Sequence, residues 1–300
     1  MSCLNLYGNT EKFFDYFFRT LKDNINTWDY FVNWNKVREN LRKIEKELHL
    51  LDYLIGKKNL EDELKSLIRE YPKVTRAIPY LIALRKNRIQ LLTDIKSFQY
   101  RNFNFGKEEY SEGEIDKIVE FFVKCGLKEV FQTEIKNVAD YVFGVEVGLD
   151  SNGRKNRTGK LMESIVEFFI RDITNELNAD FISQANREKI KKKWNLEVKL
   201  DKADRRIDFA VLYQDTLFFI EVNFYSGGGS KLKSTAGEYI EISKFWKEQE
   251  IIFVWITDGK GWLSAKAPLI EYFEKSNYLL NLEMLKEGCL KEVILKETKN

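Results

Sequence analysis

The sequence predicts an α/β (α+β) protein in which a mainly helical N-terminal region precedes a domain built on a β-sheet. Up to about residue 145, apolar residues recur at intervals of three and four, which is the period of an amphipathic helix. Between residues 161 and 273 the patterns run helix, strand, strand, helix, strand, helix, an order typical of helices packed on a sheet. We therefore expect two domains, residues 1–145 and 146–300.

The N-terminal helices are indicated by apolar spacing and by start and stop signals. One apolar face runs over residues 37–55, and a second continues over residues 60–68. Pro79 can occupy the first turn of a further helix. Residues 111–114, Ser-Glu-Gly-Glu, form a capping box before a helix that we expect to end near Gly126.

The C-terminal domain begins with a polar, basic stretch at residues 149–159, which we expect to be a loop. The elements after it follow from apolar runs, capping signals and glycines: a helix over 161–177, strands within 205–213 and over 216–224, a glycine-rich loop at 225–230, a helix from 235 to 246, a strand over 251–256 and a helix from 268 to 273.

The overall charge excludes a uniformly basic nucleic-acid coat, because the net charge is only +2. A DNA-binding surface must therefore be local, and residues 187–206 carry nine Lys or Arg against four Asp or Glu. The three cysteines are widely spaced without a C-x-x-C pair, which favours a reducing, cytoplasmic setting. No apolar run approaches the ~20 residues that span a bilayer, so we expect no membrane association.

Two carboxylates stand inside apolar runs that are typical of buried strands. Asp208 interrupts Ile-Asp-Phe-Ala-Val, and Glu221 interrupts Phe-Phe-Ile-Glu-Val-Asn. Burying an ionised carboxylate is costly without a partner or a metal. Asn223 shares a strand face with Glu221, because side chains alternate across a strand. The pair suggests a metal-dependent phosphodiester-cleaving site, although spacing alone favours the competing interpretation of exposed charges on a strand edge or solvent face.

A third carboxylate could join this pair. Glu163 lies on the helix predicted over 161–177, with Glu167 one turn further along as the alternative. A solvated helix face is the competing interpretation for Glu163 and Glu167.

The sequence contains one histidine, His49, which lies on a predicted helix. This argues against a Ser-His-Asp triad and against a His-rich metal site.

Basic and amide side chains supply candidates for DNA contact. Arginine can bind guanine bidentately, and asparagine can bind adenine. A solvated loop and a flexible turn are the competing interpretations for these segments. The candidates in the basic stretch and around the glycine loop are Arg154, Lys155, Asn156, Arg157, Lys160, Tyr225, Lys231 and Lys233.

Several segments together resemble the MboI/DpnII-type restriction endonucleases, which cut at GATC. The likeness runs in order from about residue 126 to residue 273, and the combination is far more specific than any one piece. The segments are residues 140–150, 154–159 with 162–163, 207–210, 220–225, the glycine loop, 261–266 and 268–269.

The resemblance implies a PD-(D/E)xK nuclease: a mixed central sheet flanked by helices, with Mg²⁺ as cofactor. It implies a homodimer that cuts both strands of DNA at GATC, is blocked by adenine methylation, and works beside a cognate adenine methyltransferase of the same restriction-modification system. The Mg²⁺ ligands would be Asp208, Glu221, the Val222 carbonyl and Glu163. The N-terminal helices would serve dimerisation or wrap the DNA.

Two positions depart from the nuclease pattern. Ile207 replaces the proline before the first carboxylate, and Asn223 replaces the lysine that follows the second. Asn223 would then position the attacking water, and Lys231 is a candidate to supply the missing cation. Two alternatives stay open at this stage: a repair or recombination nuclease without GATC specificity, and a non-catalytic DNA-binding protein.

Overall fold

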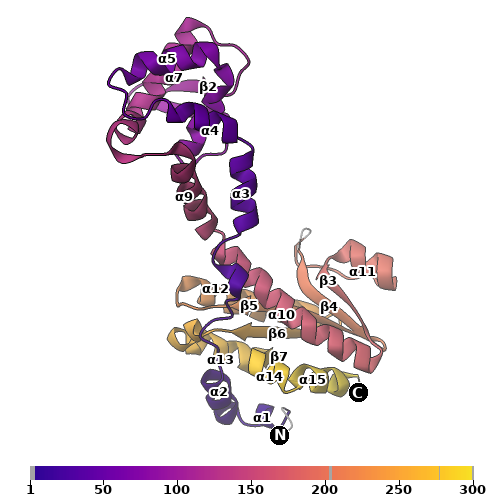
Figure 1. The fold of residues 1–300 in the computed structure, drawn as a ribbon. Helices are drawn as coiled ribbons and strands as arrows, with labels where there is room; N and C mark the ends of the chain where they lie inside the picture. The colour runs from indigo at the N-terminus through magenta and orange to yellow at the C-terminus, as the bar shows by residue number, and fades with distance from the viewer. Residues whose placement is uncertain (1–3, 203–204, 277, 299–300) are drawn as a thin grey trace. The chain divides into compact units, whose positions relative to one another are not determined.

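The computed structural model describes residues 4–202, 205–276 and 278–298. The chain forms two compact units, one comprising Met1–Thr27 with Lys155–Asn300 and the other Trp28–Arg154 (Figure 1). The expected class, a mixed sheet with flanking helices and a mainly helical N-terminal region, is confirmed. The boundary suggested at residues 145 and 146 falls within a helix, α9 (Val138–Ser151), and the first 27 residues group with the C-terminal part.

The first unit is built on a five-stranded sheet with strand order β3-β4-β5-β6-β7. The pairs β3–β4 and β4–β5 are antiparallel, whereas β5–β6 and β6–β7 are parallel. The strands are β3 (Asp180–Ala185), β4 (Ile207–Tyr213), β5 (Thr216–Phe224), β6 (Ile252–Asp258) and β7 (Tyr278–Leu280).

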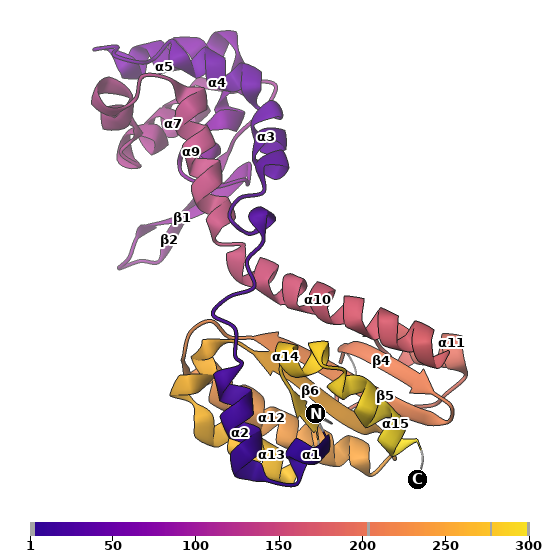
Figure 2. The same cartoon turned by 60° about the horizontal axis from the view of Figure 1, so that its bottom comes forward.

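Helices flank this sheet (Figure 2). The long helix α10 packs apolar residues such as Met162 and Val166 into the same core as the strands, and α12 packs on β6. The helices of this unit are α1 (Leu4–Tyr7), α2 (Thr10–Arg19), α10 (Arg154–Leu177), α11 (Arg187–Trp194), α12 (Ser230–Lys247), η4 (Lys260–Ser264), α13 (Lys266–Lys275), α14 (Leu282–Lys286) and α15 (Cys289–Glu297).

The N-terminal segment joins the sheet-bearing unit through an aromatic cluster and a buried carboxylate. Phe13 is fully buried and stacks on Phe273 of α13, with ring centroids 4.2 Å apart. Asp258, at the end of β6, accepts hydrogen bonds from the backbone N–H groups of Lys22 (2.7 Å), Gly259 (2.6 Å) and Leu282 (2.9 Å). These contacts explain why residues 1–27 group with the C-terminal part of the chain.

The second unit is helical apart from one β-hairpin, β1 (Arg88–Asp94) and β2 (Gln99–Asn104), which the apolar spacing did not predict. The capping box at residues 111–114 is confirmed. The helices of this unit are η1 (Trp28–Tyr30), α3 (Trp34–Arg42), α4 (Glu45–Asp52), α5 (Leu60–Glu70), η2 (Pro72–Ala77), α6 (Ile78–Leu81), α7 (Glu112–Lys124), α8 (Leu127–Glu129), η3 (Val130–Glu134) and α9.

Two predicted loops differ from the structure. The basic stretch expected as a loop is helical for most of its length, because α9 extends to Ser151 and α10 begins at Arg154. Arginine and lysine are good helix formers, so polarity alone did not mark a loop there. Helix α12 begins at Ser230 instead of Thr235, which shortens the glycine loop to residues 225–229. Among the described residues, no helix is both long enough and apolar enough to cross a membrane.

Candidate active site

The register of the sheet brings Asp208 and Glu221 together. Strands β4 and β5 pair antiparallel with Phe209 opposite Ile220, so the next pair along places Asp208 opposite Glu221 on one face. The backbone N–H of Val222 donates to Asp208 Oδ2 at 2.9 Å, which fixes the orientation of that carboxylate. Each carboxyl group lies close enough to the other to shift its pKa.

Glu221 is the more deeply buried of the two, with 7% of its surface exposed. Its Oε2 accepts a hydrogen bond from the Tyr239 hydroxyl of α12 at 3.2 Å. Its Oε1 is buried and finds no partner among the described residues. Burial raises the pKa of Glu221 well above its ordinary value, and the neighbouring Asp208 carboxyl raises it further. Burial likewise raises the pKa of Asp208.

Glu163 joins the pair through a side chain of β3. The amide Nε2 of Gln184 donates to Glu163 Oε2 at 2.9 Å and to Asp208 Oδ1 at 3.3 Å. The backbone of Gln184 has φ 49°, a left-handed conformation that is uncommon for a residue with a side chain. Burial, and after it the Asp208 charge, raise the pKa of Glu163. Glu167 instead pairs with Arg171 on the same helix, at 2.7 Å.

Asn223 is held by Trp255 of the adjacent strand β6. The indole Nε1 donates to Asn223 Oδ1 at 2.8 Å. An indole N–H can only donate, so the oxygen of the amide must face it and Nδ2 is directed elsewhere. Asn223 can therefore donate a hydrogen bond to a water or a phosphoryl oxygen through Nδ2, while it brings no positive charge.

The donor set fits a hard divalent cation. Two neighbouring carboxylates, one with a buried oxygen that has no partner among the described residues, need either a proton or a cation between them. Mg²⁺ is usually held by one or two carboxylates plus water and phosphate oxygens. Within the described residues, no group of three or more His, Cys, Asp or Glu side chains forms a ready cation site. A third carboxylate ligand would be Glu163, which the Gln184 side chain connects to Asp208 by hydrogen bonds.

The whole core of the chain matches one protein family. Residues 13–292 match the model of the DpnII restriction endonuclease. The chain belongs to this family. It is similar to the type II restriction enzyme MjaIII of Methanocaldococcus jannaschii, with 47% identity over 94% of this chain and 99% of that enzyme. It is also similar to the type II restriction enzymes DpnII of Streptococcus pneumoniae, with 36% identity over 93% and 98% of the two chains, and MboI of Moraxella bovis, with 35% over 91% and 93%.

Membership of the DpnII family makes the protein a type II site-specific deoxyribonuclease. The resemblance expected from the sequence is thus confirmed, and the non-catalytic alternative loses its support.

The basic residues proposed to contact DNA lie on helices of this DpnII-family protein. Arg154 opens α10, and its Nε donates to the Phe31 carbonyl at 3.3 Å. Lys160 is exposed on the same helix. Arg157 lies between them on α10, and it already interacts with another residue of the protein. The side chains of Lys155 and Asn156 lie outside the described part of the structure.

Two of the candidates around the glycine loop lie at the start of α12, and the third, Tyr225, directly follows β5. Lys231 and Lys233 are exposed there, and no hydrogen bond or ion pair links either of these described side chains to Asp208 or Glu221. Tyr225 is half-buried, and its hydroxyl lies 3.0 Å from Thr235 Oγ1. The structure thus does not bring Lys231 into the carboxylate cluster.

Three residues of the site were not predicted: Gln184, Tyr239 and Trp255. Each acts through a hydrogen bond whose partner lies 18 to 32 positions away along the chain. A glutamine, a tyrosine and a tryptophan in apolar segments are usually core or surface residues, so sequence pattern offers no specific signal for them. The nearest signal was the DpnII-family resemblance itself, which did not include these positions.

Proposed function

We propose that the protein cuts both strands of DNA at GATC in a Mg²⁺-dependent reaction that adenine methylation of the site blocks. The observation that carries this proposal is the placement of Asp208 opposite Glu221 on β4 and β5, with Glu221 Oε1 buried and unpartnered among the described residues. Uncompensated buried carboxylate charge is expensive unless the site is built to bind a cation. Similarity to enzymes named DpnII and MboI supports the GATC assignment.

The Mg²⁺ ligands would be Asp208, Glu221 and the Val222 carbonyl, with Glu163 as a metal or water ligand. When bound, the ion supplies a nucleophilic water and stabilises negative charge on the phosphorus centre. Tyr239 and the Val222 N–H hold the two carboxylates in place through hydrogen bonds of 3.2 and 2.9 Å. Asn223 Nδ2 orients the water that attacks phosphorus in line and expels the 3′ oxygen.

The wider setting follows from the palindromic target. A two-fold symmetric site favours a homodimer, in which each copy cuts one strand. The protein would act in the cytoplasm as the nuclease of a restriction-modification system. A cognate adenine methyltransferase would modify the same GATC sites without needing to bind the nuclease. The helical unit would contribute to dimerisation or to DNA contact.

The test is digestion of adenine-methylated and unmethylated plasmid by the purified full-length protein, with and without Mg²⁺, followed by sequencing of the ends. We expect discrete fragments with ends at GATC only from unmethylated DNA and only with the cation. Fragments with ends at other sequences would contradict the GATC assignment, and cleavage in the presence of a chelator would contradict the cation dependence.

Asp208→Ala provides the matched inactive variant. Loss of a ligand that contributes several kcal/mol of charge stabilisation should lower the cleavage rate by about 10³-fold or more. Binding to a GATC duplex should persist, because removing a carboxylate also removes repulsion of phosphate. Glu167→Ala, on the ion pair with Arg171, serves as the control and should cut normally. Full cleavage by Asp208→Ala would exclude the site.

A further inference from the structure

The β1–β2 hairpin of the second unit has two faces with different surroundings. Its register pairs Leu91 with Arg101 and Gln90 with Asn102, so alternate residues point to opposite sides of the ribbon. Nearly all of its side chains from Arg88 to Asn102 are exposed. A two-stranded ribbon whose side chains are this exposed is only marginally stable by itself, so its faces need a packing or binding partner.

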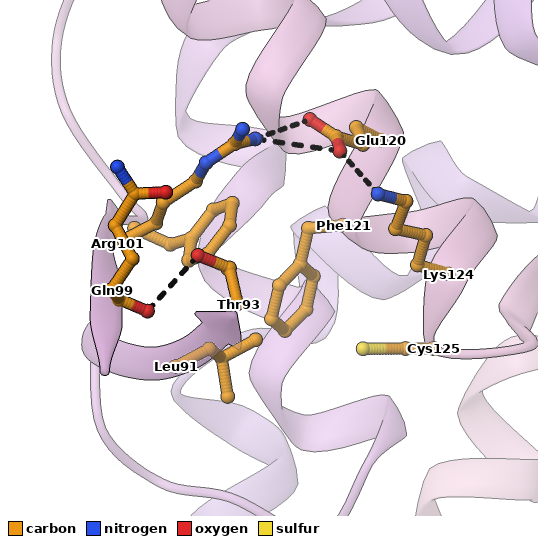
Figure 3. A pocket seen from close by; sticks show the side chains of 9 residues that line it. Leu91, Thr93, Gln99, Arg101, Glu120, Phe121, Lys124 and Cys125 are labelled. Carbon is orange, nitrogen blue, oxygen red and sulfur yellow. Dashed lines mark hydrogen bonds and ion pairs between the residues drawn. The ribbon is translucent and has the colours of Figure 1, made fainter. Parts of the chain in front are cut away.

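One face already has its partner in helix α7. A cavity of the hairpin on this side is lined by Leu91, Thr93, Gln99 and Arg101 from the strands and by Glu120 and Phe121 from the helix (Figure 3). Arg101 pairs with Glu120 at 3.1 Å, and Lys124 pairs with the same carboxylate at 2.6 Å. This face belongs to the internal packing of the helical unit.

The opposite face carries amides and a guanidinium group that take no part in internal bonding. Arg88 stands opposite Asn104, and Gln90 stands opposite Asn102. Arg88, Gln90 and Asn102 are exposed, and Asn104 is half-buried. None of these four side chains makes a hydrogen bond or ion pair with any described residue. A cavity at the same positions is lined by these four residues together with Ile89 and Phe103.

A guanidinium group together with side-chain amides is the combination that recognises the edges of DNA bases by hydrogen bonding. Arginine binds guanine O6 and N7 with two hydrogen bonds, and asparagine or glutamine binds adenine N6 and N7 in the same way. The major groove of B-DNA admits a two-stranded β-ribbon. We propose that the outer face of β1–β2, formed by Arg88, Gln90, Asn102 and Asn104, enters the major groove and reads the bases of the recognition sequence. This inference rests on the proposed function, since it assigns the sequence-reading surface of that enzyme.

Charge favours DNA over a second protein copy as the occupant of this face. Residues 85–101 contain five Lys or Arg and one acidic residue, Asp94. Lys86 and Lys96 flank the four polar residues, and no described acidic side chain pairs with either lysine. Protein–DNA interfaces are more polar and far more positive than protein–protein interfaces, whose buried centres are depleted in charge.

The apolar residues of the hairpin lie towards its tip. Leu92 stands opposite Tyr100 on the outer face, with 41% and 54% of their surfaces exposed. Apolar contact with the thymine methyl group is part of major-groove recognition. Leu92 and Tyr100 therefore extend the same reading surface beyond the polar pairs.

The experiment measures binding by the full chain carrying Asp208→Ala, so that the DNA is not cut. Fluorescence anisotropy compares a GATC duplex, duplexes with one base pair of the site changed, and an unrelated duplex. Gln90→Ala and Asn102→Ala should each weaken GATC binding by about 5- to 150-fold. Affinity for the unrelated duplex should stay the same, because amide contacts to bases contribute nothing to nonspecific binding.

Gln99→Ala is the matched control, since it makes the same change on the face that meets α7. It should bind every duplex as the Asp208→Ala chain does. Circular dichroism of each variant checks that the hairpin unit is folded. Unchanged preference for GATC in both outer-face variants would overturn the inference. A shift of these variants from dimer to monomer in sedimentation, with the preference for GATC kept, would also overturn the inference. The outer face would then bind a second copy of the protein instead of DNA.

Failure of this inference is distinct from failure of the proposed function. The hairpin assignment fails alone when the unmodified protein cuts at GATC and the Gln90→Ala and Asn102→Ala chains discriminate between duplexes equally well. The proposed function fails when the unmodified protein cuts no DNA with Mg²⁺ and prefers no duplex, and the reading surface then falls with it.

Discussion

The side-chain nitrogen of Gln184 lies 2.9 Å from Glu163 Oε2 and ties that helix residue to the strand carboxylates. The same nitrogen lies 3.3 Å from Asp208 Oδ1. One neutral amide thus holds together two acidic side chains that would otherwise repel. Because a metal site depends on the groups that orient its ligands, Gln184 is positioned to influence cation binding without touching the cation.

Gln184→Glu should destabilise the metal-free protein and make its stability depend more strongly on divalent cations. The change removes a hydrogen-bond donor to a charged group, at a cost of about 1.5–3 kcal/mol, and adds a fourth carboxyl group to Glu163, Asp208 and Glu221. Thermal unfolding with and without Ca²⁺ is the measurement. Ca²⁺ should raise the melting temperature more in the variant than in the unmodified protein, because ligand binding stabilises the folded state.

Gln184→Leu separates the loss of the donor from the added charge. This variant should bind Ca²⁺ about 10- to 100-fold more weakly, as expected when an outer partner of a metal ligand is removed. Gln99→Glu makes the charge change of Gln184→Glu on the hairpin instead, and it should leave Ca²⁺ affinity unchanged. Equal Ca²⁺ affinity in Gln184→Leu and the unmodified protein would remove the positioning role.

Asn223 and Trp255 should behave as a coupled pair. Asn223→Ala leaves the indole N–H of Trp255 without its acceptor, which should lower the free energy of unfolding by about 1–3 kcal/mol. Trp255→Phe removes the donor instead. In the double variant the stability losses should be less than additive, because the second change removes a hydrogen bond that is already lost.

The same variants separate stability from catalysis. If Asn223 Nδ2 orients the attacking water, Asn223→Ala should also lower the cleavage rate at saturating DNA while GATC binding persists. Trp255→Phe should have the smaller effect on rate. Strictly additive stability losses, combined with an unchanged cleavage rate in Asn223→Ala, would show that Asn223 has neither role.

The metal-free protein should lose stability from its active site as the pH rises. Burial raises the pKa values of Glu221, Asp208 and Glu163, so the folded state binds protons more tightly than the unfolded state. The contribution of Glu221 is fully present below its ordinary value of 4.5 and is lost as the pH rises through the raised pKa of the folded protein.

Urea unfolding of the metal-free protein across this pH window provides the measurement. Glu221→Gln should lose less stability than the unmodified protein between pH 4.5 and neutrality, since it cannot ionise. Glu241→Gln is the exposed control, because the Lys244 hydrogen bond lowers the pKa of Glu241 and its linkage has the opposite sign. Identical pH profiles for Glu221→Gln and the unmodified protein would contradict the raised pKa.

Asp258→Asn tests the attachment of the N-terminal segment. The substitution replaces one of the two acceptor oxygens with an NH₂ group, which cannot accept a hydrogen bond. That group would face a backbone N–H of Lys22, Gly259 or Leu282. We expect the free energy of unfolding to fall by about 1.5–3 kcal/mol and residues 1–27 to become more sensitive to protease. Asp94→Asn, at an exposed hairpin turn, should change stability much less. Equal protease resistance at the N-terminus would contradict the attachment.

The strand pair that carries the site could be predicted because its signals are local. Strand β5 has the bounds expected from its apolar run, and β4 begins at Ile207 within the expected segment. Side-chain alternation places Asn223 on the face of Glu221, and an antiparallel turn brings Asp208 opposite. The resemblance to the restriction endonuclease family then pointed to the same three residues.

Other parts of the structure depend on contacts that no local pattern encodes. The role of Gln184 follows from the left-handed backbone of one residue and from the packing of α10 beside β3. The sequence pattern does not indicate the hairpin, because Leu91 and Leu92 are adjacent apolar residues and the register shifts between Leu92 and Asp94, which together obscure the period of two. The basic start of α10 has the polarity of a loop, although arginine and lysine are good helix formers.

The place of the first 27 residues has a consequence for how the enzyme is made. Tyr7 donates to the carbonyl of Leu279 at 2.9 Å, and Asn281 donates to the carbonyl of Phe17 at 3.0 Å. At about 5–20 residues per second, the ribosome needs roughly 10–50 s to add the segment that these early helices pack against. A nascent chain that has not yet reached residues 279–281 therefore lacks the partners of its first helices, and the sheet-bearing unit of the nuclease closes only after these residues are made.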